Sequence, residues 1–447
     1  MKEFQENSHF DKINILVVGS GAREHALAWK LSHSPRTKNI YVAPGNPGLD
    51  SMSKLTPIKV DDLDGLINFA LELRPGLVVI GPESPLAAGL VNHLEAIGLK
   101  VFGPLATAAR LETSKVFAKQ FMVRHGIPTA AWASFTSVGE ALRYLEGWPD
   151  GPIVVKVAGL AAGKGVTVAR DRGEAVAAVR AAMEERCFGV AGEVVIIEDY
   201  LEGEEVSVLC FTDGQTIVPM PAVQDHKRLG EGDTGPNTGG MGAYSPVSAY
   251  TSEVAAQVER TIIKPTLAGL KAEGLDFRGC LYCGLMLPAS GSPYQGPQVI
   301  EYNARFGDPE AQVLVPILKS DLVEIMLACA GGTLTGQTIE WRDEASVAVV
   351  VASGGYPDDF DTGLVVTEKI PSRAGASLIF HGGTAVNQNG EIVTSGGRVM
   401  TIVARDLTLE KALLKAYDRV RAIHFKNSYY RRDIGYRELA RRQLTED

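Results

Sequence analysis

The feature that most constrains this chain is a short strand followed by a glycine-rich loop and a return strand. Residues 153–157 are β-branched except for Lys156, the loop 159–165 carries three glycines and Lys164, and residues 166–168 read as the second strand. Glycines let a backbone close on a ligand with its N–H groups pointing inward, which suits phosphate oxygens. A Walker A loop is excluded because it needs a different glycine spacing and a following helix. The pattern predicts a hairpin that covers the phosphates of ATP between two sheets.

The order of predicted strands and helices divides the chain into three domains, so the expected fold class is α/β and α+β multidomain. Residues 1–113 alternate between strands and helices, which predicts a doubly wound parallel sheet with ligands at the carboxyl ends of its strands. Residues 114–338 combine helices with antiparallel strands and contain a small α+β lid over about residues 127–201. Residues 339–447 predict a β-rich domain that closes with a helix over residues 408–423.

Composition narrows the class of protein. The 447 residues carry a net charge of −9 without a basic block, which argues against a nucleic-acid partner. No apolar run reaches the roughly 18 residues of a membrane span, and residues 1–12 lack the apolar stretch of a secretory signal. Five cysteines form no disulfide pattern, so we expect a reducing compartment, the cytoplasm. Cys280 and Cys283 lie in a strand pattern without a second pair, which favours core packing over zinc binding.

A second glycine turn follows the first predicted strand. The turn Gly-Ser-Gly at residues 19–21 precedes a helix, but Glu24 stands where a dinucleotide fingerprint needs its third glycine. The N-terminus of that helix can still hold a phosphate with Arg23 as a charged donor; alternatively, Arg23 is a solvated side chain beside a tight turn. Glu83 follows a later strand at the same crevice and is a candidate acceptor for a hydroxyl or an amine. A phosphorylated sugar therefore fits this domain better than NAD.

Several charged residues near the predicted hairpin are further candidates to contact ATP. An isolated ammonium is costly inside an apolar strand, so Lys156 must reach water or an anion, and the nearby loop favours a phosphate. Lys115 is a weaker candidate for the same contact. Glu198 ends a strand, and Glu205 follows it within reach of a ribose diol. Taken alone, these two acids would be solvated loop charges.

Residues 299–303 have the pattern of a strand and contain two candidate metal ligands. Glu301 and Asn303 share one face of that strand and place two hard oxygen ligands side by side. Such a pair suits Mg²⁺ that bridges nucleotide phosphates. Arg305 continues the same face and is a candidate to contact the transferring phosphoryl group. A cross-strand charge pair is the alternative interpretation.

The glycine-rich segment 224–246 predicts a long loop that serves as a lid or clamp. Asp225, His226 and Lys227 stand at its start. The carboxylate suits an ammonium group and the cations suit a carboxylate or phosphate, so the set could hold a zwitterion. A single histidine is weak evidence for acid–base chemistry, and we interpret His226 as a substrate contact.

Five motifs together carry a resemblance to a known family. They are Gly-Ser-Gly-Ala-Arg-Glu-His-Ala-Leu (19–27), Gly-Leu-Ala-Ala-Gly-Lys-Gly (159–165), Gln-Asp-His-Lys-Arg (224–228), Thr-Gly-Pro-Asn-Thr-Gly-Gly-Met-Gly-Ala-Tyr-Ser-Pro (234–246) and Arg-Phe-Gly-Asp-Pro-Glu (305–310). With them the chain resembles the phosphoribosylamine–glycine ligase family of the ATP-grasp superfamily. The resemblance implies a central ATP-grasp fold of two α+β subdomains. It also implies ATP-dependent ligation of glycine to 5-phosphoribosylamine in purine biosynthesis, through a glycyl phosphate, with glycinamide ribonucleotide, ADP and phosphate as products.

The resemblance further implies roles for individual residues. The substrates would contact Gly21, Arg23, Glu24, Glu83, Asp225, His226, Lys227 and Asp308. ATP would contact Lys115, Lys156, Gly163, Lys164, Gly165, Glu198, Leu201 and Glu205, and Mg²⁺ or Mn²⁺ would be held by Glu301 and Asn303. The catalytic residues would be Arg305, Lys156 and Asp225. Glycine and 5-phosphoribosylamine are then the small-molecule partners, no nucleic acid or membrane partner is expected, and a monomer is expected, with a dimer as the alternative.

Two positions depart from the family pattern, and three alternatives stay open. Ala22 stands where the family usually has glycine, and Ala158 stands where it usually has aspartate. The alternatives are an ATP-grasp ligase with another carboxylate or amine, an NAD-dependent oxidoreductase, and a nucleotide sensor without turnover. Glu24 disfavours the oxidoreductase, and the metal-binding pattern disfavours the sensor.

Overall fold

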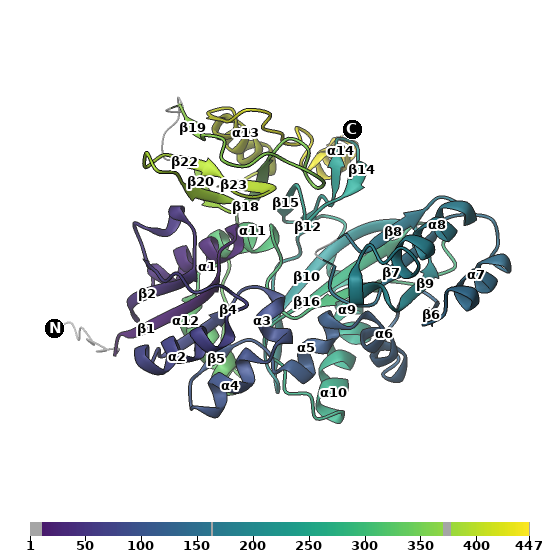
Figure 1. Ribbon diagram of the computed structural model, residues 1–447, viewed down its shortest axis with the longest axis horizontal. Helices are drawn as coiled ribbons and strands as arrows, with labels where there is room; N and C mark the ends of the chain where they lie inside the picture. Colours follow the sequence, from purple (N-terminus) through teal and green to yellow (C-terminus); the bar gives the residue numbers. More distant parts are fainter. Residues whose placement is uncertain (1–10, 162–163, 370–376, 447) are drawn as a thin grey trace.

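The computed structural model describes residues 11–161, 164–369 and 377–446. Figure 1 shows an N-terminal domain in purple, a C-terminal domain in yellow-green above it, and a teal lid that projects to the right of the central strands. This arrangement confirms the predicted α/β and α+β multidomain class. Within the described ranges, no helix is both long and apolar enough to cross a membrane.

The N-terminal domain is built on a parallel sheet with the strand order β3-β2-β1-β4-β5. Its strands are β1 (Ile13–Gly19), β2 (Thr37–Pro44), β3 (Lys54–Leu55), β4 (Leu77–Ile80) and β5 (Val101–Phe102). Its helices are α1 (Ala22–Ser32), α2 (Leu63–Leu73), α3 (Glu83–Ala87) and α4 (Leu90–Ala96). The winding direction reverses between β1 and β4, so the glycine turn after β1 and Glu83 after β4 border the same crevice.

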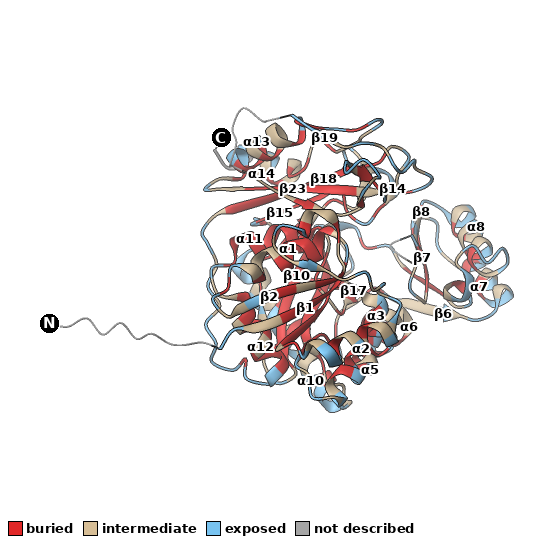
Figure 2. Ribbon diagram, turned by 60° about the vertical axis from the view of Figure 1, so that its left-hand side comes forward, coloured by how far each residue is buried: buried red, intermediate tan, exposed pale blue. Residues whose placement is uncertain are grey.

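The central domain contains an antiparallel sheet with the order β11-β10-β16-β17. Its strands are β10 (Gly203–Asp213), β11 (Ile217–Pro219), β16 (Arg278–Pro288) and β17 (Gln298–Asn303). Helices α5 (Ala106–Thr113) and α6 (Lys115–Arg124) lead into this domain, and α9 (Ser252–Val258), α10 (Lys264–Ala272), α11 (Glu310–Ile317) and α12 (Leu322–Gly331) belong to its later part. Figure 2 shows that the strands at the middle of the molecule are mostly buried.

The lid is a four-stranded antiparallel sheet with the order β6-β9-β7-β8. Its elements are β6 (Trp132–Phe135), α7 (Val138–Glu146), β7 (Ile153–Val157), β8 (Val166–Ala169), α8 (Arg172–Met183) and β9 (Val195–Asp199). Buried side chains of both helices and of β7, β8 and β9 form an apolar cluster of their own, separate from the clusters of the remaining domains. Because the lid has its own core, it can change orientation without exposing the cores of its neighbours.

The C-terminal domain is built on an antiparallel sheet with the order β12-β15-β18-β23-β20. Its first two strands are the short β12 (Gln224–Asp225) and β15 (Gly242–Ser245). Its long strands are β18 (Ala345–Ala352), β20 (Ser377–His381) and β23 (Arg398–Asp406), and helix α13 (Leu409–Val420) packs on β23 and β18. Short pairs are formed by β21 (Thr384–Val386) with β22 (Ile392–Thr394) and by β19 (Thr367–Glu368) with β24 (Ile423–His424). Helix α14 (Tyr436–Glu446) follows, so the prediction that the chain closes with the helix at 408–423 was wrong.

The prediction of a long loop over residues 224–246 was also wrong. The segment forms β12 (Gln224–Asp225), β13 (Arg228–Gly230), β14 (Thr234–Asn237) and β15 (Gly242–Ser245). β15 pairs with β18 about a hundred residues later, from Gly242 opposite Val349 to Ser245 opposite Ser346. Strands this short have no periodicity of their own, because a distant partner supplies their hydrogen bonds. In the N-terminal domain, helices α3 and α4 are separated at Gly89, which has a φ of +82°.

Candidate active site

The hairpin formed by β7 and β8 brings Lys156 against the central sheet. The Nζ atom of Lys156 donates to the carbonyl of Ile300 at 3.3 Å and forms an ion pair with Glu198 on β9. Lys115, at the start of α6, donates from Nζ to the carbonyl of Gly159 at 3.0 Å. Burial lowers the pKa of Lys115 from its ordinary value. Both predicted lysines therefore lie at the glycine-rich loop.

Glu198 is shared between Lys156 and a second lysine, Lys119 on α6. Lys119 is 3% exposed and also donates to the hydroxyl of Thr129 at 2.8 Å, which donates to the carbonyl of Val299 at 2.7 Å. Burial lowers the pKa of Lys119 to about 8, although Glu198 opposes the change. Sequence reasoning missed Lys119 because helical lysines are usually exposed. Its placement one turn after Lys115 on the same helix was the available signal.

Glu301 and Asn303 lie on β17, and several cations lie near the carboxylate of Glu301. The Nζ atom of Lys227 is 3.6 Å from Oε1 of Glu301. Burial alone would raise the pKa of Glu301, but Lys227, Lys156, Lys115 and Arg305 lower it below its ordinary value. No hydrogen bond to the side-chain amide of Asn303 is found in the part of the chain that the structure describes.

This donor set fits a hard divalent cation. An ionised carboxylate and an amide oxygen without a partner are oxygen ligands of the kind that Mg²⁺ takes, and this ion commonly uses one or two protein ligands together with substrate phosphates. Among the described residues there is no group of three or more His, Cys, Asp or Glu arranged to hold a metal. Phosphate oxygens and water would therefore complete the coordination at Glu301 and Asn303.

Asp225 and Lys227 lie beside strand β17, which carries Glu301 and Asn303. Lys227 forms an ion pair with Glu205 at 2.9 Å, so the predicted ribose contact and the predicted substrate cation are neighbours. Oδ1 of Asp225 is buried and has no hydrogen-bond partner within the described ranges. Burial raises the pKa of Asp225 from 3.8 to about 7, with Lys227 acting in the opposite direction and Glu310 reinforcing the rise. A ligand that donates hydrogen bonds, such as an ammonium group, would satisfy this oxygen.

Both ring nitrogens of His226 have partners within the protein. Nε2 accepts a hydrogen bond from the N–H of Gly435 at 3.0 Å, and Nδ1 is 3.6 Å from Oδ1 of Asp233. The same Asp233 carboxylate pairs with the fully buried Arg431 at 2.7 Å. In this conformation the imidazole ties the segment to the C-terminal domain, and the substrate contact of His226 stays a prediction.

Arg305 follows strand β17 and links it to residues of the N-terminal part of the chain. Its Nη2 atom is 2.9 Å from Oε1 of Glu112, and its Nε atom donates to Oε2 of Glu83 at 3.3 Å. The other oxygen of Glu112 accepts from the N–H of Ala304 at 2.7 Å. Burial opposes charge on Arg305, but the two carboxylates raise its pKa well above the ordinary value. Glu112 was missed by sequence reasoning because its partners lie almost two hundred residues away in the chain.

The glycine turn of the N-terminal domain makes room for Glu24. Oε2 of Glu24 accepts from the N–H of Gly21 at 2.7 Å, and Nε of Arg23 donates to Oε1 at 2.6 Å. A Cβ atom placed on Gly81 would lie 2.1 Å from Oε1 of Glu24. Arg23 is 7% exposed and also donates to the carbonyl of Phe306 at 3.0 Å, so the alternative of a solvated arginine was wrong. Contacts of Arg23 and Glu24 with a substrate stay predictions.

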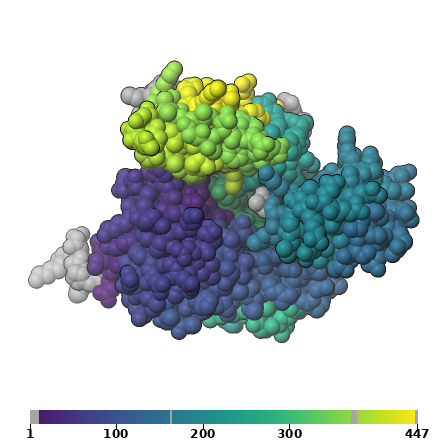
Figure 3. Space-filling view, viewed as in Figure 1, coloured from purple at the N-terminus to yellow at the C-terminus, as the bar shows by residue number. Residues whose placement is uncertain are grey.

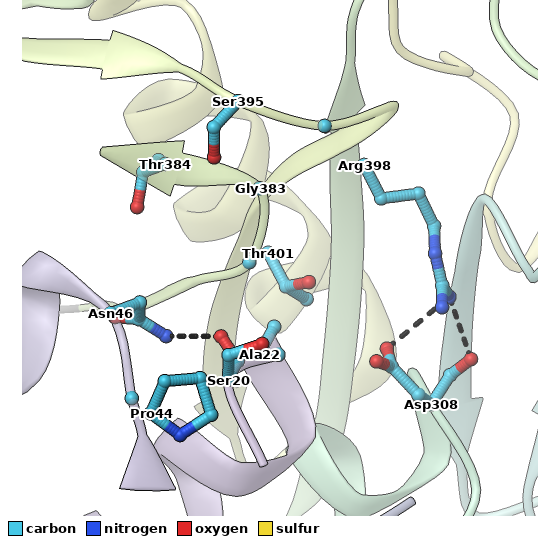
Figure 4. A pocket seen from close by; sticks show the side chains of 14 residues that line it. Ser20, Ala22, Pro44, Asn46, Asp308, Gly383, Thr384, Ser395, Arg398 and Thr401 are labelled. Atoms are coloured by element: carbon cyan, nitrogen blue, oxygen red, sulfur yellow. Dashed lines mark hydrogen bonds and ion pairs between the residues drawn. The ribbon is translucent and has the colours of Figure 1, made fainter. Parts of the chain in front are cut away.

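Asp308 lies beside a pocket of about 470 Å³ between the N-terminal and C-terminal domains (Figure 4). Nη1 of Arg398 is 3.2 Å from Oδ1 of Asp308 and donates to its carbonyl at 2.7 Å. Burial would raise the pKa of Asp308, but Arg398 and Arg23 hold it below its ordinary value. Arg398, on a strand of the C-terminal domain, carries no local motif and was missed by sequence reasoning.

The remaining predicted ATP contacts lie around the lid. Leu201 packs with Ala130 and Met286 in a small apolar cluster next to the lid strands. Lys164 is exposed, and a Cβ atom on Gly165 would lie 2.4 Å from Cγ2 of Val157, so only glycine fits there without a shift. The predicted contact at Gly163 lies outside the described residues.

Two groups of predicted residues are thus brought together. One lies where the lid meets the central sheet and contains Lys115, Lys156, Glu198, Glu205, Lys227, Glu301 and Asn303. The other lies at the crevice of the N-terminal domain and contains Gly21, Arg23, Glu24, Glu83 and Asp308. Arg305 bridges the two groups through Glu83 and through its effect on Glu301. Figure 3 shows a hollow on this face, bordered by the N-terminal domain, the C-terminal domain and the lid.

Comparison with known proteins gives consistent matches along the chain. Models of phosphoribosylglycinamide synthetase match residues 13–112 as the N domain, residues 113–311 as the ATP-grasp (A) domain and residues 346–437 as the C domain. The trifunctional purine biosynthetic protein adenosine-3 of Gallus gallus is 49% identical over 95% of this chain, and the chain spans 42% of its length. A phosphoribosylamine–glycine ligase of Chlorobaculum tepidum is 48% identical over 96% of this chain and 100% of its own length.

A solved structure agrees with these matches. The crystal structure of a phosphoribosylamine–glycine ligase from Thermotoga maritima superposes with a TM-score of 0.80 at 34% identity, covering 94% of this chain and 100% of that one. The resemblance drawn from the five motifs is therefore confirmed. The chain belongs to the phosphoribosylglycinamide synthetase family, with an ATP-grasp fold as its central domain.

Proposed function

We propose that this protein ligates glycine to 5-phosphoribosylamine with ATP, giving glycinamide ribonucleotide, ADP and phosphate. Its family membership supports the substrates. The observation that carries the proposal is the group of four cations, Lys115, Lys156, Lys227 and Arg305, whose charges all act on the carboxylate of Glu301. A triphosphate with a divalent cation would neutralise this group, and few other ligands carry that much negative charge.

The geometry supports one orientation of ATP. The apolar cluster around Leu201 offers a surface on which adenine would pack, and Glu205 would accept hydrogen bonds from the ribose hydroxyls. The phosphates would then extend towards Lys115 and Lys156, under the loop that contains Lys164 and Gly165. Mg²⁺, or Mn²⁺ in its place, would be held by Glu301 and Asn303 and would offset charge on the phosphates and orient the terminal one.

The reaction joins a carboxylate to an amine in two steps. A glycine oxygen attacks the γ-phosphorus, the bond to the bridging oxygen breaks, and ADP leaves with that electron pair. The amine of phosphoribosylamine then attacks the carbonyl carbon of glycyl phosphate, phosphate leaves with the electron pair of the broken C–O bond, and the nitrogen gives up one proton, which the released phosphate accepts. Because an anion attacks an anion in the first step, Lys156 and Arg305 act by offsetting charge and by positioning.

Individual carboxylates have separate tasks in this proposal. Asp225 would accept a hydrogen bond from the ammonium of glycine through its unpartnered Oδ1 atom. Glu83, held by Arg305, would accept a hydrogen bond from the amine of phosphoribosylamine. Closure of the lid would exclude water, which otherwise hydrolyses the acyl phosphate. We extend the proposal to a monomer in the cytoplasm, in keeping with five free cysteines and no disulfide among them.

A direct assay tests the proposed function. ADP release is followed with ATP, Mg²⁺, glycine and phosphoribosylamine generated in situ, and each component is omitted in turn. We expect ADP release only when all are present, with one glycinamide ribonucleotide formed per ADP. Release that continues without glycine, or that is supported better by another amino acid or amine, would indicate a different ligase of the same fold.

A further inference from the structure

Two backbone segments connect the central domain with the lid, an entry segment at residues 128–131 and an exit segment at residues 199–202. The loop that joins β16 to β17 lies beside both. At its start, Ala289 donates its N–H to the carbonyl of Glu202 at 2.9 Å. Just after its end, Val299 donates its N–H to the carbonyl of Pro128 at 2.8 Å. The loop therefore runs from the exit segment to the entry segment, which together form the hinge of the lid.

Tyr294 of this loop contacts both hinge segments through one hydroxyl group. The hydroxyl accepts a hydrogen bond from the N–H of Ala131 at 3.0 Å and donates one to Oδ2 of Asp199. The N–H of Asp199 in turn donates to the carbonyl of Ala131 at 2.9 Å. Burial and the carboxylate of Asp199 raise the pKa of Tyr294, so the hydroxyl keeps its proton at neutral pH. Three hydrogen bonds thus join Tyr294, Ala131 and Asp199 in a closed ring.

The aromatic ring of Tyr294 adds an apolar contact to the same hinge. It packs against the cluster of Ala130, Leu201 and Met286, which is the surface on which we place adenine. Leu201 lies only two residues after Asp199 in the exit segment. A shift of the exit segment would therefore move Leu201 and change the surface offered to the nucleobase.

Hydrogen bonds within the loop hold Tyr294 in place. Its N–H donates to Oγ of Ser292 at 3.2 Å. The side-chain amide of Gln298, the first residue of β17, donates to the carbonyls of Gln295 at 3.2 Å and Gly296 at 3.1 Å. Gly296 has a φ of +68°, a conformation that suits glycine at this turn. These contacts order the loop, so the hydroxyl of Tyr294 is in position before a nucleotide binds.

The hydrogen bonds of Tyr294 favour a lid orientation that suits the nucleotide site. In this orientation Lys156 of the lid reaches the carbonyl of Ile300 on β17 at 3.3 Å, one residue before Glu301. A lid with a looser hinge spends more time in other orientations. Because the apparent affinity for a ligand falls with the fraction of molecules in the binding orientation, such a lid binds nucleotide more weakly.

We propose that Tyr294 is a positioning residue for ATP, whose hydroxyl joins the entry and exit segments and thereby holds the lid where the nucleotide binds. It acts through Ala131, Asp199 and Leu201 rather than on the phosphates, so it determines the affinity for ATP more than kcat. Tyr294 lies outside the five motifs and outside every site predicted from the sequence. The inference rests on the proposed function for the identity of the nucleotide.

Calorimetric titration with ADP and Mg²⁺ tests this inference, because it needs neither glycine nor phosphoribosylamine. Tyr294→Phe removes the hydroxyl and keeps the ring in the apolar cluster. Since one hydrogen bond changes an equilibrium by about two- to tenfold and two are lost, the variant should bind ADP at least about threefold more weakly. The matched control is Tyr144→Phe on α7 of the same lid, because the hydroxyl of Tyr144 has no hydrogen-bond partner within the described ranges.

Two substitutions of Asp199 test whether Tyr294 acts through this carboxylate. Asp199→Ala removes the acceptor of the hydroxyl and should weaken ADP binding. Asp199→Asn keeps an acceptor oxygen and should bind ADP within about twofold of the wild type. The double variant Tyr294→Phe/Asp199→Ala should bind like Tyr294→Phe alone, because residues that share one interaction are not additive. A loss in the double variant equal to the product of the two single losses would contradict the inference.

Hydrogen exchange and kinetics separate a loosened hinge from a damaged fold. In Tyr294→Phe, peptides that cover the entry and exit segments should exchange faster, whereas peptides from β10 and β16 should be unchanged. The KM of ATP should rise, while kcat and the KM of glycine should stay within about twofold of the wild type. Unchanged ADP binding in Tyr294→Phe, or an equal loss in Tyr144→Phe, would overturn the inference.

The hinge role and the proposed function can fail independently. If glycine-dependent ADP release is found but Tyr294→Phe binds ADP like the wild type, the function stands and the hinge role of Tyr294 is wrong. If Tyr294→Phe weakens ADP binding but glycine supports no turnover, Tyr294 stands as a positioning residue for the nucleotide and the function is wrong.

Discussion

Lys119 on α6 and Glu198 on β9 form a buried ion pair that joins the central domain to the lid. Glu198 also pairs with Lys156, so one carboxylate holds two lysines. The lid has its own apolar core, and this shared carboxylate is one of its polar attachments to the remainder of the molecule. The position of the lid over the nucleotide site therefore depends on Glu198.

Replacement of Glu198 by Gln should loosen the lid. It leaves two buried ammonium groups without a counter-ion, and breaking a buried ion pair in this way costs about 3–5 kcal/mol. We expect faster amide hydrogen exchange in β7 and β9 and a higher KM for ATP. Lys119→Met is the comparison: it removes the partner of Glu198 that lies outside the lid, but it leaves no ammonium group without a counter-ion, because Glu198 keeps Lys156, so it should speed exchange less than Glu198→Gln. Equal effects of the two variants would contradict the shared role of Glu198.

Asp225 should make stability depend on pH. Its pKa is raised from 3.8 in the unfolded chain to about 7 in the folded protein, so the folded state binds more protons between these values. Stability that is present below pH 4 is then lost as the pH rises through 7, by at most about 1.4 kcal/mol per pH unit. Melting temperatures across this range should fall with pH in the wild type relative to Asp225→Asn. A parallel pH dependence of the two proteins would refute the shift, and the exposed Asp61→Asn is the control.

Glu301→Gln should reduce turnover without unfolding the protein. The substitution removes the charged member of the Glu301–Asn303 pair and leaves four cations facing the phosphates without their carboxylate. Losses of transition-state stabilisation of this kind are on the order of 10²–10³ in kcat. Steady-state assays over a range of Mg²⁺ concentrations measure the effect, with the exposed Glu340→Gln as control. A variant with normal kcat and normal Mg²⁺ dependence would exclude Glu301 as a metal ligand.

Arg305→Lys should impair catalysis although the charge is kept. The guanidinium contacts Glu112 through Nη2 and Glu83 through Nε at the same time, whereas an ammonium cannot keep both contacts in this geometry. We expect kcat to fall by about tenfold or more, with a smaller change in the KM of ATP. Arg124→Lys is a matched control, because Arg124 makes a two-nitrogen contact with Glu273 at the surface. If both substitutions leave kcat unchanged, Arg305 has no positioning role.

The parts of the site that could be predicted from sequence depend on local patterns. Strand geometry over a few residues is enough to place Lys156, which lies in a β-branched strand before a glycine loop. The same geometry places Glu301 and Asn303 on one face of their strand. In the structure Lys156 lies on β7, and Glu301 and Asn303 lie on β17, as expected. Strand periodicity places these side chains regardless of how the rest of the chain folds.

The parts that could not be predicted depend on contacts between distant segments. Lys119 is recognisable only once Glu198 is packed against α6, and Arg398 only once β23 is placed over the glycine turn. The short strand β15 exists because β18 supplies its hydrogen bonds. Such roles follow from tertiary pairing, which a single sequence does not reveal by periodicity.

Transfer of an oxygen isotope tests the central claim most directly. The assay uses glycine with ¹⁸O in both carboxylate positions, unlabelled ATP, phosphoribosylamine and Mg²⁺, and mass spectrometry of the phosphate released. If glycine attacks the γ-phosphorus and the amine then displaces phosphate, one ¹⁸O atom should appear in each inorganic phosphate and the other should stay in the amide product. Phosphate without ¹⁸O, accompanied by normal formation of the amide, would contradict the glycyl phosphate pathway.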